Sequence, residues 1–248
     1  VSTKCAQRRL FVSYYCKTKM GKEVKRKYLI IAPHSDDALF SCSHVLLLPE
    51  YEVQVLTVEN DEKRVKEDEK LFEFLNIPYY HLELDFKDES YYGYNKDYPK
   101  GITLENAYKY LNEYFGRETL NEIETALVEW VRNFLIKNEF YRVLAPWGVG
   151  HPFHFFVRET LQQGFSYMEY YREFPHSYKR RSQAQVEEQK KEWYLKSSVP
   201  VEEFADIKWK LASKFYKSQS GLLFYENGYI KKNLPEEIWC RKDSDLPF

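Results

Sequence analysis

The run from Tyr28 to Phe40, Tyr-Leu-Ile-Ile-Ala-Pro-His-Ser-Asp-Asp-Ala-Leu-Phe, constrains the fold of this chain more than any other segment. A short apolar strand is expected to end at His34, Asp36 and Asp37, and a helical pattern follows at once. Two acids and a histidine at the end of a buried strand are costly to hold without a partner, and a divalent cation is one such partner. Ligands also usually bind at the carboxyl ends of strands in an open α/β sheet. The run therefore predicts a strand, a ligand site and a helix in direct succession.

Strand-like and helix-like segments alternate along the chain, which predicts a single α/β domain with a Rossmann-like, mostly parallel β-sheet flanked by helices. The expected strands cover residues 27–32, 51–58, 79–84, 141–145 and 165–171, with an edge strand within 225–240. The expected helices cover residues 37–48, 62–75, 104–114, 120–137, 151–163 and 201–219. The polar run 179–191 is expected to be a solvated loop or edge.

The domain organisation follows from the same pattern. Residues 1–26 are interpreted as an N-terminal extension and residues 27–248 as the domain. Within the domain, residues 85–116 interrupt the alternation and are too long for a plain connection, so they are expected to form a substrate loop.

The charge balance narrows the class of partner. Thirty-seven basic residues oppose 38 acidic ones, a net charge of −1, and no long basic block stands out. We therefore expect neither nucleic acid nor an anionic membrane as a partner. No segment approaches the roughly 20 apolar residues of a membrane span, so no integral membrane segment is expected. The sequence predicts no particular oligomeric state.

Cysteine usage favours a cytoplasmic protein. The four cysteines are too far apart for a zinc knuckle and indicate reduced thiols, with a disulfide between Cys5 and Cys16 as the open alternative. Residues 1–21 lack the apolar run of a secretory signal, although the chain does not begin with Met.

Aromatic residues are abundant, with 22 Tyr, 17 Phe and 5 Trp. They suit core packing, and they also suit carbohydrate binding because aromatic rings present flat apolar faces with polar tips. Composition alone does not separate these two interpretations.

Two short histidine clusters follow expected strands. The first is His34-x-x-Asp37 with Asp36 inside it, and the second is His151-x-x-His154. Two histidines and a carboxylate are a common ligand set for a catalytic zinc ion, which keeps a fourth position open for water. Such an ion lowers the pKa of water to about 7 and polarises a carbonyl group. A second carboxylate nearby can then act as general base. The two clusters together predict a hydrolytic metal site.

At these residues the chain resembles the PIG-L/LmbE-like family of zinc-dependent N-deacetylases. The family motif Pro/Ala-His-Pro-Asp-Asp-Glu corresponds to residues 33–38, Pro-His-Ser-Asp-Asp-Ala, and His-Pro-Asp-His corresponds to residues 151–154, His-Pro-Phe-His. An Arg-x-x-Glu helix motif matches residues 64–67, and a Lys…Tyr-x-Ser-Gln motif matches Lys208 followed by residues 216–219. The four matches stand in the family's order along residues 27–220.

The resemblance implies a role for each matching residue of the two clusters. His34, Asp37 and His154 would bind one zinc ion. Asp36 would be the base that takes a proton from the attacking water. His151 would stabilise the developing oxyanion or protonate the leaving amine.

The resemblance also implies the fold, the substrate and the reaction. The fold would be LmbE-like, and the reaction would be hydrolysis of the N-acetyl group of an N-acetylglucosamine-type amino sugar or conjugate. Arg64 would contact this small-molecule substrate, and Asp88 would hold sugar hydroxyls. Iron or manganese suits similar ligands, so zinc is the expected metal but not the only candidate.

Some positions depart from the family pattern. Ser35 replaces the motif proline, Ala38 replaces its glutamate, and Phe153 replaces the acid of the second motif. Charged partners of metal ligands often account for about 10- to 100-fold in affinity or activity. The absence of acids at positions 38 and 153 is therefore expected to affect the rate and the pH optimum of the reaction.

Three alternative functions stay open. The chain could be an amidase acting on another N-acyl sugar conjugate. It could be a non-catalytic, zinc-containing carbohydrate-binding protein, although a structural site has no use for the base Asp36. A nucleotide-binding Rossmann domain is the third, and it is disfavoured because no G-x-G-x-x-G run is present.

Other polar residues are expected to be structural rather than functional. Arg64 and Glu67 have the spacing of a plain surface pair on a helix. The remaining residues expected to be ordinary or fold-supporting are His44, His81, His176, Lys208, Tyr216 and Gln219.

Overall fold

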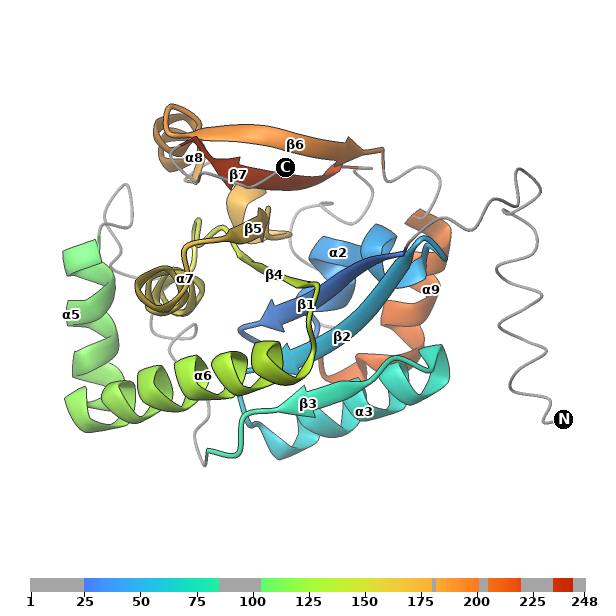
Figure 1. The fold of residues 1–248 in the computed structure, drawn as a ribbon, viewed down its shortest axis with the longest axis horizontal. Helices are drawn as coiled ribbons and strands as arrows, with labels where there is room; N and C mark the ends of the chain where they lie inside the picture. The colour runs from blue at the N-terminus through green and yellow to red at the C-terminus, as the bar shows by residue number, and fades with distance from the viewer. Residues whose placement is uncertain (1–24, 85–103, 180–181, 201–204, 220–233, 243–248) are drawn as a thin grey trace, which may run out of the picture.

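The computed structural model describes residues 25–84, 104–179, 182–200, 205–219 and 234–242 of the chain. They form an α/β fold in which helices flank one mostly parallel, seven-stranded sheet (Figure 1), so the predicted fold class is confirmed at this level. The N-terminal extension, apart from residues 25 and 26, and most of the predicted substrate loop lie outside the described residues.

The sheet has the order β3-β2-β1-β4-β5-β7-β6, and its first five strands are parallel. The strands are β1 (Arg26–Ala32), β2 (Tyr51–Thr57), β3 (Tyr79–His81), β4 (Tyr141–Pro146), β5 (Met168–Tyr171), β6 (Trp193–Val199) and β7 (Glu236–Arg241). The chain first builds outward from β1 to β3 and then returns to the other side of β1 with β4. Such a reversal is where open parallel sheets bind ligands, outside the carboxyl ends of the strands.

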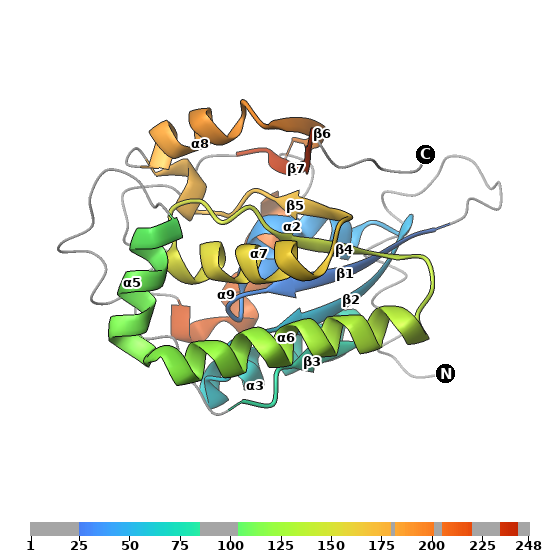
Figure 2. The same ribbon diagram turned by 60° about the vertical axis from the view of Figure 1, so that its left-hand side comes forward.

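Helices cover both faces of this sheet (Figures 1 and 2). The helices are α2 (Asp37–Leu47), α3 (Glu62–Leu75), α5 (Leu104–Phe115), α6 (Arg117–Lys137), α7 (Pro152–Gly164), α8 (Gln183–Gln189) and α9 (Ala205–Phe215), with the 3-10 helices η1 (His176–Tyr178) and η4 (Lys217–Gln219). Helices α6 and α7 lie on one face, and α2, α3 and α9 lie on the other.

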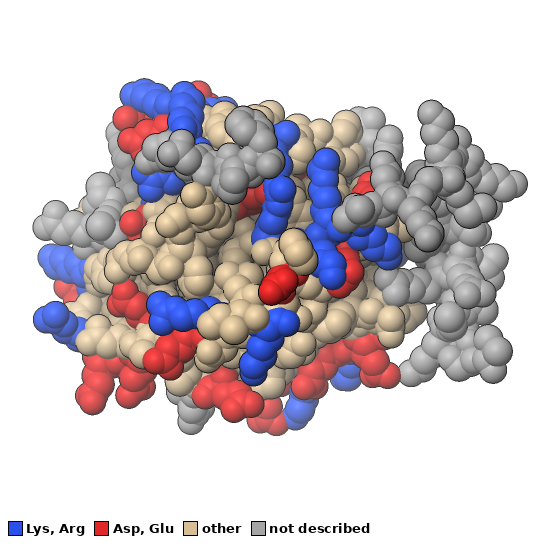
Figure 3. Space-filling view, in the orientation of Figure 1, with Lys and Arg blue, Asp and Glu red and all other residues tan. Residues whose placement is uncertain are grey.

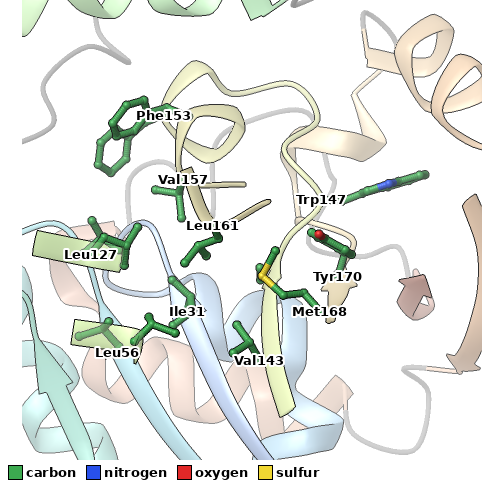
Figure 4. Close-up of a cluster of buried hydrophobic side chains, with 14 of the residues drawn as sticks. Ile31, Leu56, Leu127, Val143, Trp147, Phe153, Val157, Leu161, Met168 and Tyr170 are labelled. Carbon is green, nitrogen blue, oxygen red and sulfur yellow. The ribbon is translucent and has the colours of Figure 1, made fainter. Parts of the chain in front are cut away.

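The side chains of β1 alternate between two hydrophobic cores. Leu29 and Ile31 pack toward α6 and α7, whereas Tyr28 and Ile30 pack toward α2, α3 and α9. Figure 4 shows the first core, where the side chain of Ile31 lies with those of Leu127 from α6 and Leu161 from α7. A strand buried on both faces needs a continuous apolar run, which explains the sequence of β1.

The carboxyl-terminal part of the sheet differs from the prediction. The run 179–191, expected to be a solvated loop or edge, contains α8, whose Val186 is fully buried. Strand β6 was not predicted, and it forms the edge of the sheet beyond β7. The strand expected at the edge is β7, which lies between β5 and β6. The irregular register between Leu195 and Ser197 breaks the alternation of β6, which removed the periodic signal that predicts a strand.

Acidic and basic side chains are interspersed over the face shown in Figure 3. Among the described residues, no helix is both long and apolar enough to cross a membrane.

The Lys…Tyr-x-Ser-Gln motif holds α9 and η4 against α3. The hydroxyl group of Tyr216 donates a hydrogen bond to the carboxylate of Asp68. The backbone N–H and the hydroxyl group of Ser218 both donate to the carboxylate of Glu67. Glu67 is therefore not the surface partner of Arg64 that its helical spacing predicts, whereas the fold-supporting role expected for Tyr216 is confirmed.

A buried ion pair forms hydrogen bonds with the backbone groups at a break in α2. The backbone of Cys42 is non-helical, and the N–H of His44 donates to Glu236 Oε2 at 2.9 Å instead of continuing the helix. Lys208 Nζ lies 2.8 Å from Glu236 Oε1 and also donates to the carbonyl oxygen of Phe40. The Lys208 and Glu236 side chains thus bond the backbone groups that the break leaves unpaired.

We expect Glu236→Gln to destabilise the fold by about 3–5 kcal/mol, because it leaves the Lys208 ammonium group buried beside a neutral partner. Burial by itself raises the pKa of Glu236. Lys208 and His44 lower that pKa by more than burial raises it, so the pKa of Glu236 lies below its ordinary value. A group with a lowered pKa stabilises the fold above its unfolded pKa of about 4.3 and loses that contribution as the pH falls.

Urea unfolding of wild type and Glu236→Gln between pH 3 and pH 7 measures this difference. It is expected to be full above about pH 5 and to shrink toward pH 3. The exposed pair of Glu62 with Lys66 supplies the control, because Glu62→Gln should leave the free energy of unfolding almost unchanged. A difference for Glu236→Gln that stays constant from pH 7 to pH 3 would contradict the role of this ion pair.

Candidate metal centre

The two histidine clusters lie at the carboxyl ends of neighbouring parallel strands. Strand β1 ends at Ala32 and is followed by the first cluster, and β4 ends at Pro146 and leads through a four-residue loop to the second. The register pairs Ile30 with Leu144, so the two strands end side by side. This pairing brings together clusters that are more than a hundred residues apart in the chain, since His154 comes 120 positions after His34.

Three buried histidines converge at this point. His34, His151 and His154 offer ligand atoms that all lie within 4.8 Å of one another. Their ring centroids are 4.8–4.9 Å apart in every pair. This triad could hold a metal ion, whose identity the protein atoms alone do not determine.

The carboxylate of Asp37 lies between two of these histidines. Asp37 Oδ2 is 3.3 Å from His34 Nδ1 and 3.2 Å from His154 Nε2, and the two nitrogens are 2.9 Å apart. In a tetrahedral zinc site with bonds of about 2.0–2.2 Å, two ligand atoms are separated by about 3.3–3.6 Å. The three atoms are therefore spaced close to one face of a tetrahedral ligand set.

The protonation state of Asp37 suits a cation. Burial by itself raises the pKa of its carboxyl group, but His154 and His34 hold that pKa well below its usual range. A carboxylate must be deprotonated to bind a metal ion. Asp37 is in that form at neutral pH.

Asp36 is the N-cap residue of α2, with a φ of 96° that is unusual outside glycine. Burial raises the pKa of Asp36 to about 8, Arg64 opposes the rise, and Asp37 adds to it. A carboxyl group whose pKa lies near the working pH has the property that a general base needs.

The guanidinium group of Arg64 is held by its neighbours. Nη1 lies 2.9 Å from Glu59 Oε2, and Nη2 donates to the carbonyl oxygen of Ser35 at 2.8 Å. Nη2 also lies 3.5 Å from Asp36 Oδ2. Arg64 therefore links the segment after β2, which carries Glu59, to the turn that carries Asp36. A substrate contact of Arg64 stays a prediction, and Asp88 lies outside the described residues.

His151 is the N-cap residue of α7, and its Nδ1 accepts a hydrogen bond from the N–H of Phe153 at 3.3 Å. Pro152 follows at the first helical position, where its missing N–H costs nothing. A neutral imidazole that accepts at Nδ1 carries its proton on Nε2. His151 is thus a hydrogen-bond donor at Nε2.

Two further residues belong to this centre that the sequence did not reveal as functional. His176, expected to be an ordinary loop residue, has its ring 4.9 Å from that of His151 and 5.1 Å from that of His154. The fully buried Glu173 has its Oε1 3.7 Å from His154 Nδ1. Both residues follow β5, which pairs in parallel with β4, so the segments after these two strands lie at the same edge of the sheet. Knowing that β5 is the neighbour of β4 would therefore have indicated that His176 and Glu173 lie near His151 and His154.

The loop before His151 depends on glycine. Gly150 has a φ of 83°, and a Cβ atom there would lie 2.7 Å from the carbonyl oxygen of His176 and 2.6 Å from Ser182 Oγ. Only glycine permits both this conformation and this close approach. The loop is thereby held against the segment after β5 that carries His176.

The cysteines give the centre no ligand among the described residues. Cys42 and Cys240 are buried free thiols, and Cys5 and Cys16 lie outside the described residues.

Comparisons of the chain with protein-family models, with curated proteins and with solved structures found no match. The functional interpretation therefore depends on the motifs and on the geometry of the centre.

Metal binding at this centre is expected to require His34 and His154, whose ring nitrogens are 2.9 Å apart. We expect His34→Ala and His154→Ala each to weaken zinc binding by more than the roughly 10- to 100-fold that is typical for loss of a partner outside the ligand set. Competition with a chromophoric chelator measures the affinity. His81→Ala, at the end of β3, is the matched control and should bind zinc like wild type. Unchanged binding by either of the first two variants would place the metal elsewhere.

Proposed function

We propose that this chain is a zinc-dependent hydrolase that removes the N-acetyl group from an N-acetylglucosamine-type amino sugar or conjugate, on an LmbE-like fold. One observation carries the proposal. Ligand atoms of His34, Asp37 and His154 lie 2.9–3.3 Å apart, and a second, half-buried carboxylate, Asp36, is adjacent to Asp37 in the chain. The four motifs in family order and the mostly parallel sheet support the same assignment. A small-molecule substrate and a cytoplasmic location belong to this proposal.

The proposed ligand set contains Asp37 rather than His151. A metal ligand must offer a lone pair, and the N-cap hydrogen bond leaves His151 with its proton on Nε2. Asp37 instead presents a deprotonated oxygen between the other two ligand atoms. His34, Asp37 and His154 with an open fourth position are the donor set of a catalytic zinc site.

The remaining residues then have separate tasks in amide hydrolysis. A bound zinc ion would lower the pKa of water to about 7 and polarise the acetyl carbonyl group. Asp36 would accept the proton of the attacking water, and Arg64 would hold the Asp36 carboxylate in place. His151 would donate from Nε2 to the oxyanion, an interaction worth about 2.7–4 kcal/mol of transition-state stabilisation in other enzymes. Asp36 would then pass this proton to the departing nitrogen as the C–N bond breaks, so the products are acetate and a free amine.

The identity of the metal ligands can be tested with two paired variants. We expect Asp37→Ala to lose tight zinc binding and His151→Ala to retain it, because His151 is proposed to act on the substrate and not on the metal. Metal content after dialysis against a weak chelator, together with the zinc affinity, measures this. The reverse result would assign the site to the three histidines.

The catalytic assignment can be tested by acetate release from a panel of N-acetylated amino sugars. We expect metal-loaded wild type to release acetate, and Asp36→Asn to keep its metal but to lose about two or more decades of rate, since general-base catalysis contributes about 10²–10⁴-fold. Asp206→Asn, an exposed acid on α9, is the control and should react like wild type.

The outcomes separate the alternatives. Bound metal without acetate from any substrate would favour the non-catalytic carbohydrate-binding protein or the amidase for another acyl group. An Asp36→Asn variant that keeps both its metal and the full rate would remove Asp36 from the mechanism.

A further inference from the structure

Glu173 is a buried acid that lies in none of the four motifs. It lies two residues beyond the end of β5 and has no exposed surface. Its Oε1 accepts hydrogen bonds from the backbone N–H groups of Gly148 and Val149, the latter at 3.2 Å. The same oxygen lies 3.7 Å from His154 Nδ1. Glu173 therefore contacts both the loop that leads to His151 and the ring of His154.

Each of these two side chains has a buried polar atom without a hydrogen-bond partner. His154 Nδ1 and Glu173 Oε2 are both inaccessible to solvent and have no hydrogen-bond partner among the described residues. Buried polar atoms are nearly always hydrogen-bonded, so each exception needs an explanation. A proton on His154 Nδ1, shared with the Glu173 carboxylate, would satisfy the nitrogen and use the acceptor capacity of the acid.

The opposite side of the His154 ring explains why this proton matters. His154 Nε2 lies 2.9 Å from His34 Nδ1 and 3.2 Å from Asp37 Oδ2, so Nε2 is the atom that faces the other ligand atoms. Nε2 can offer its lone pair only when the ring proton is on Nδ1. A carboxylate that accepts from Nδ1 holds a histidine in this tautomer and makes Nε2 a stronger donor to a metal.

We propose that Glu173 is a positioning residue for the metal centre, which fixes the tautomer and the orientation of His154. This inference rests on the proposed function, because it assumes that His154 binds the metal through Nε2. It goes beyond that function because it assigns a role to the carboxylate of Glu173, which comes from the segment after β5 and lies behind the proposed ligand His154.

The variant Glu173→Gln removes the negative charge of this side chain but keeps an oxygen that can accept hydrogen bonds from backbone N–H groups. The amide oxygen of glutamine can still accept from Gly148 and Val149, but the negative charge beside Nδ1 is gone. We expect zinc affinity to fall by about 10- to 100-fold and the visible absorption of the cobalt-loaded protein to change, because the His154 donor is altered.

Glu169→Gln is the matched control. Glu169 is also a buried glutamate, lies in β5 four residues before Glu173, and pairs with Arg142 and Lys196 away from the histidines. It should leave both the zinc affinity and the cobalt spectrum unchanged. Glu173→Gln with wild-type affinity and spectrum would overturn the proposed role of Glu173 while leaving the proposed function intact.

A second measurement needs no variant. In a long-range ¹H–¹⁵N spectrum of the zinc-loaded wild type, His154 is expected to carry its proton on Nδ1 and to bind through Nε2. A His154 that is protonated on Nε2 would overturn the inference. A wild type that binds no metal at all would overturn the proposed function and this inference together.

Discussion

The parallel pairing of β1 with β4 is the constraint on which the rest of this structure depends. It makes two strands end side by side, so that His34 and His154 come within 2.9 Å of each other from segments 120 positions apart. Both strands are buried, which fixes their register because a slip of one residue would turn every core side chain to the wrong face. The register of the sheet therefore sets where the two histidine clusters meet.

Collecting so many polar groups in the interior requires that each be paired, since unpaired buried charges are costly. Glu59 and the Ser35 carbonyl group hold Arg64 beside Asp36, and Glu173 stands behind His154. On the far side of α2, Lys208 and Glu236 bond the groups freed by the break in that helix. Removing one member of such a pair is expected to cost more than the pair itself contributes.

The structure shows what surrounds Phe153, one of the positions that departs from the motifs of the resembled family. Phe153, which stands where the resembled family has an acid, is fully buried and packs its ring against Phe156 and His34. The carboxylate that faces His154 comes instead from Glu173, twenty positions further along the chain. A missing acid in a motif is thus no measure of the charge around a metal site, because the neighbouring strand can supply it.

The sequence by itself determined most of the local helices and strands and the two histidine clusters that form the site. The apolar run of β1, the helix predicted over residues 62–75 with both observed bounds, and the histidine clusters after β1 and β4 all follow from periodicity and short motifs. Only the tertiary structure decided that β7 is internal, that β6 forms the edge, that Glu59 pairs with Arg64, and that Glu173 and His176 belong to the centre. Strand order depends on hydrogen bonds between distant segments, and the role of a buried polar residue depends on which groups the other strands place beside it, so neither leaves a periodic or local signal in the chain.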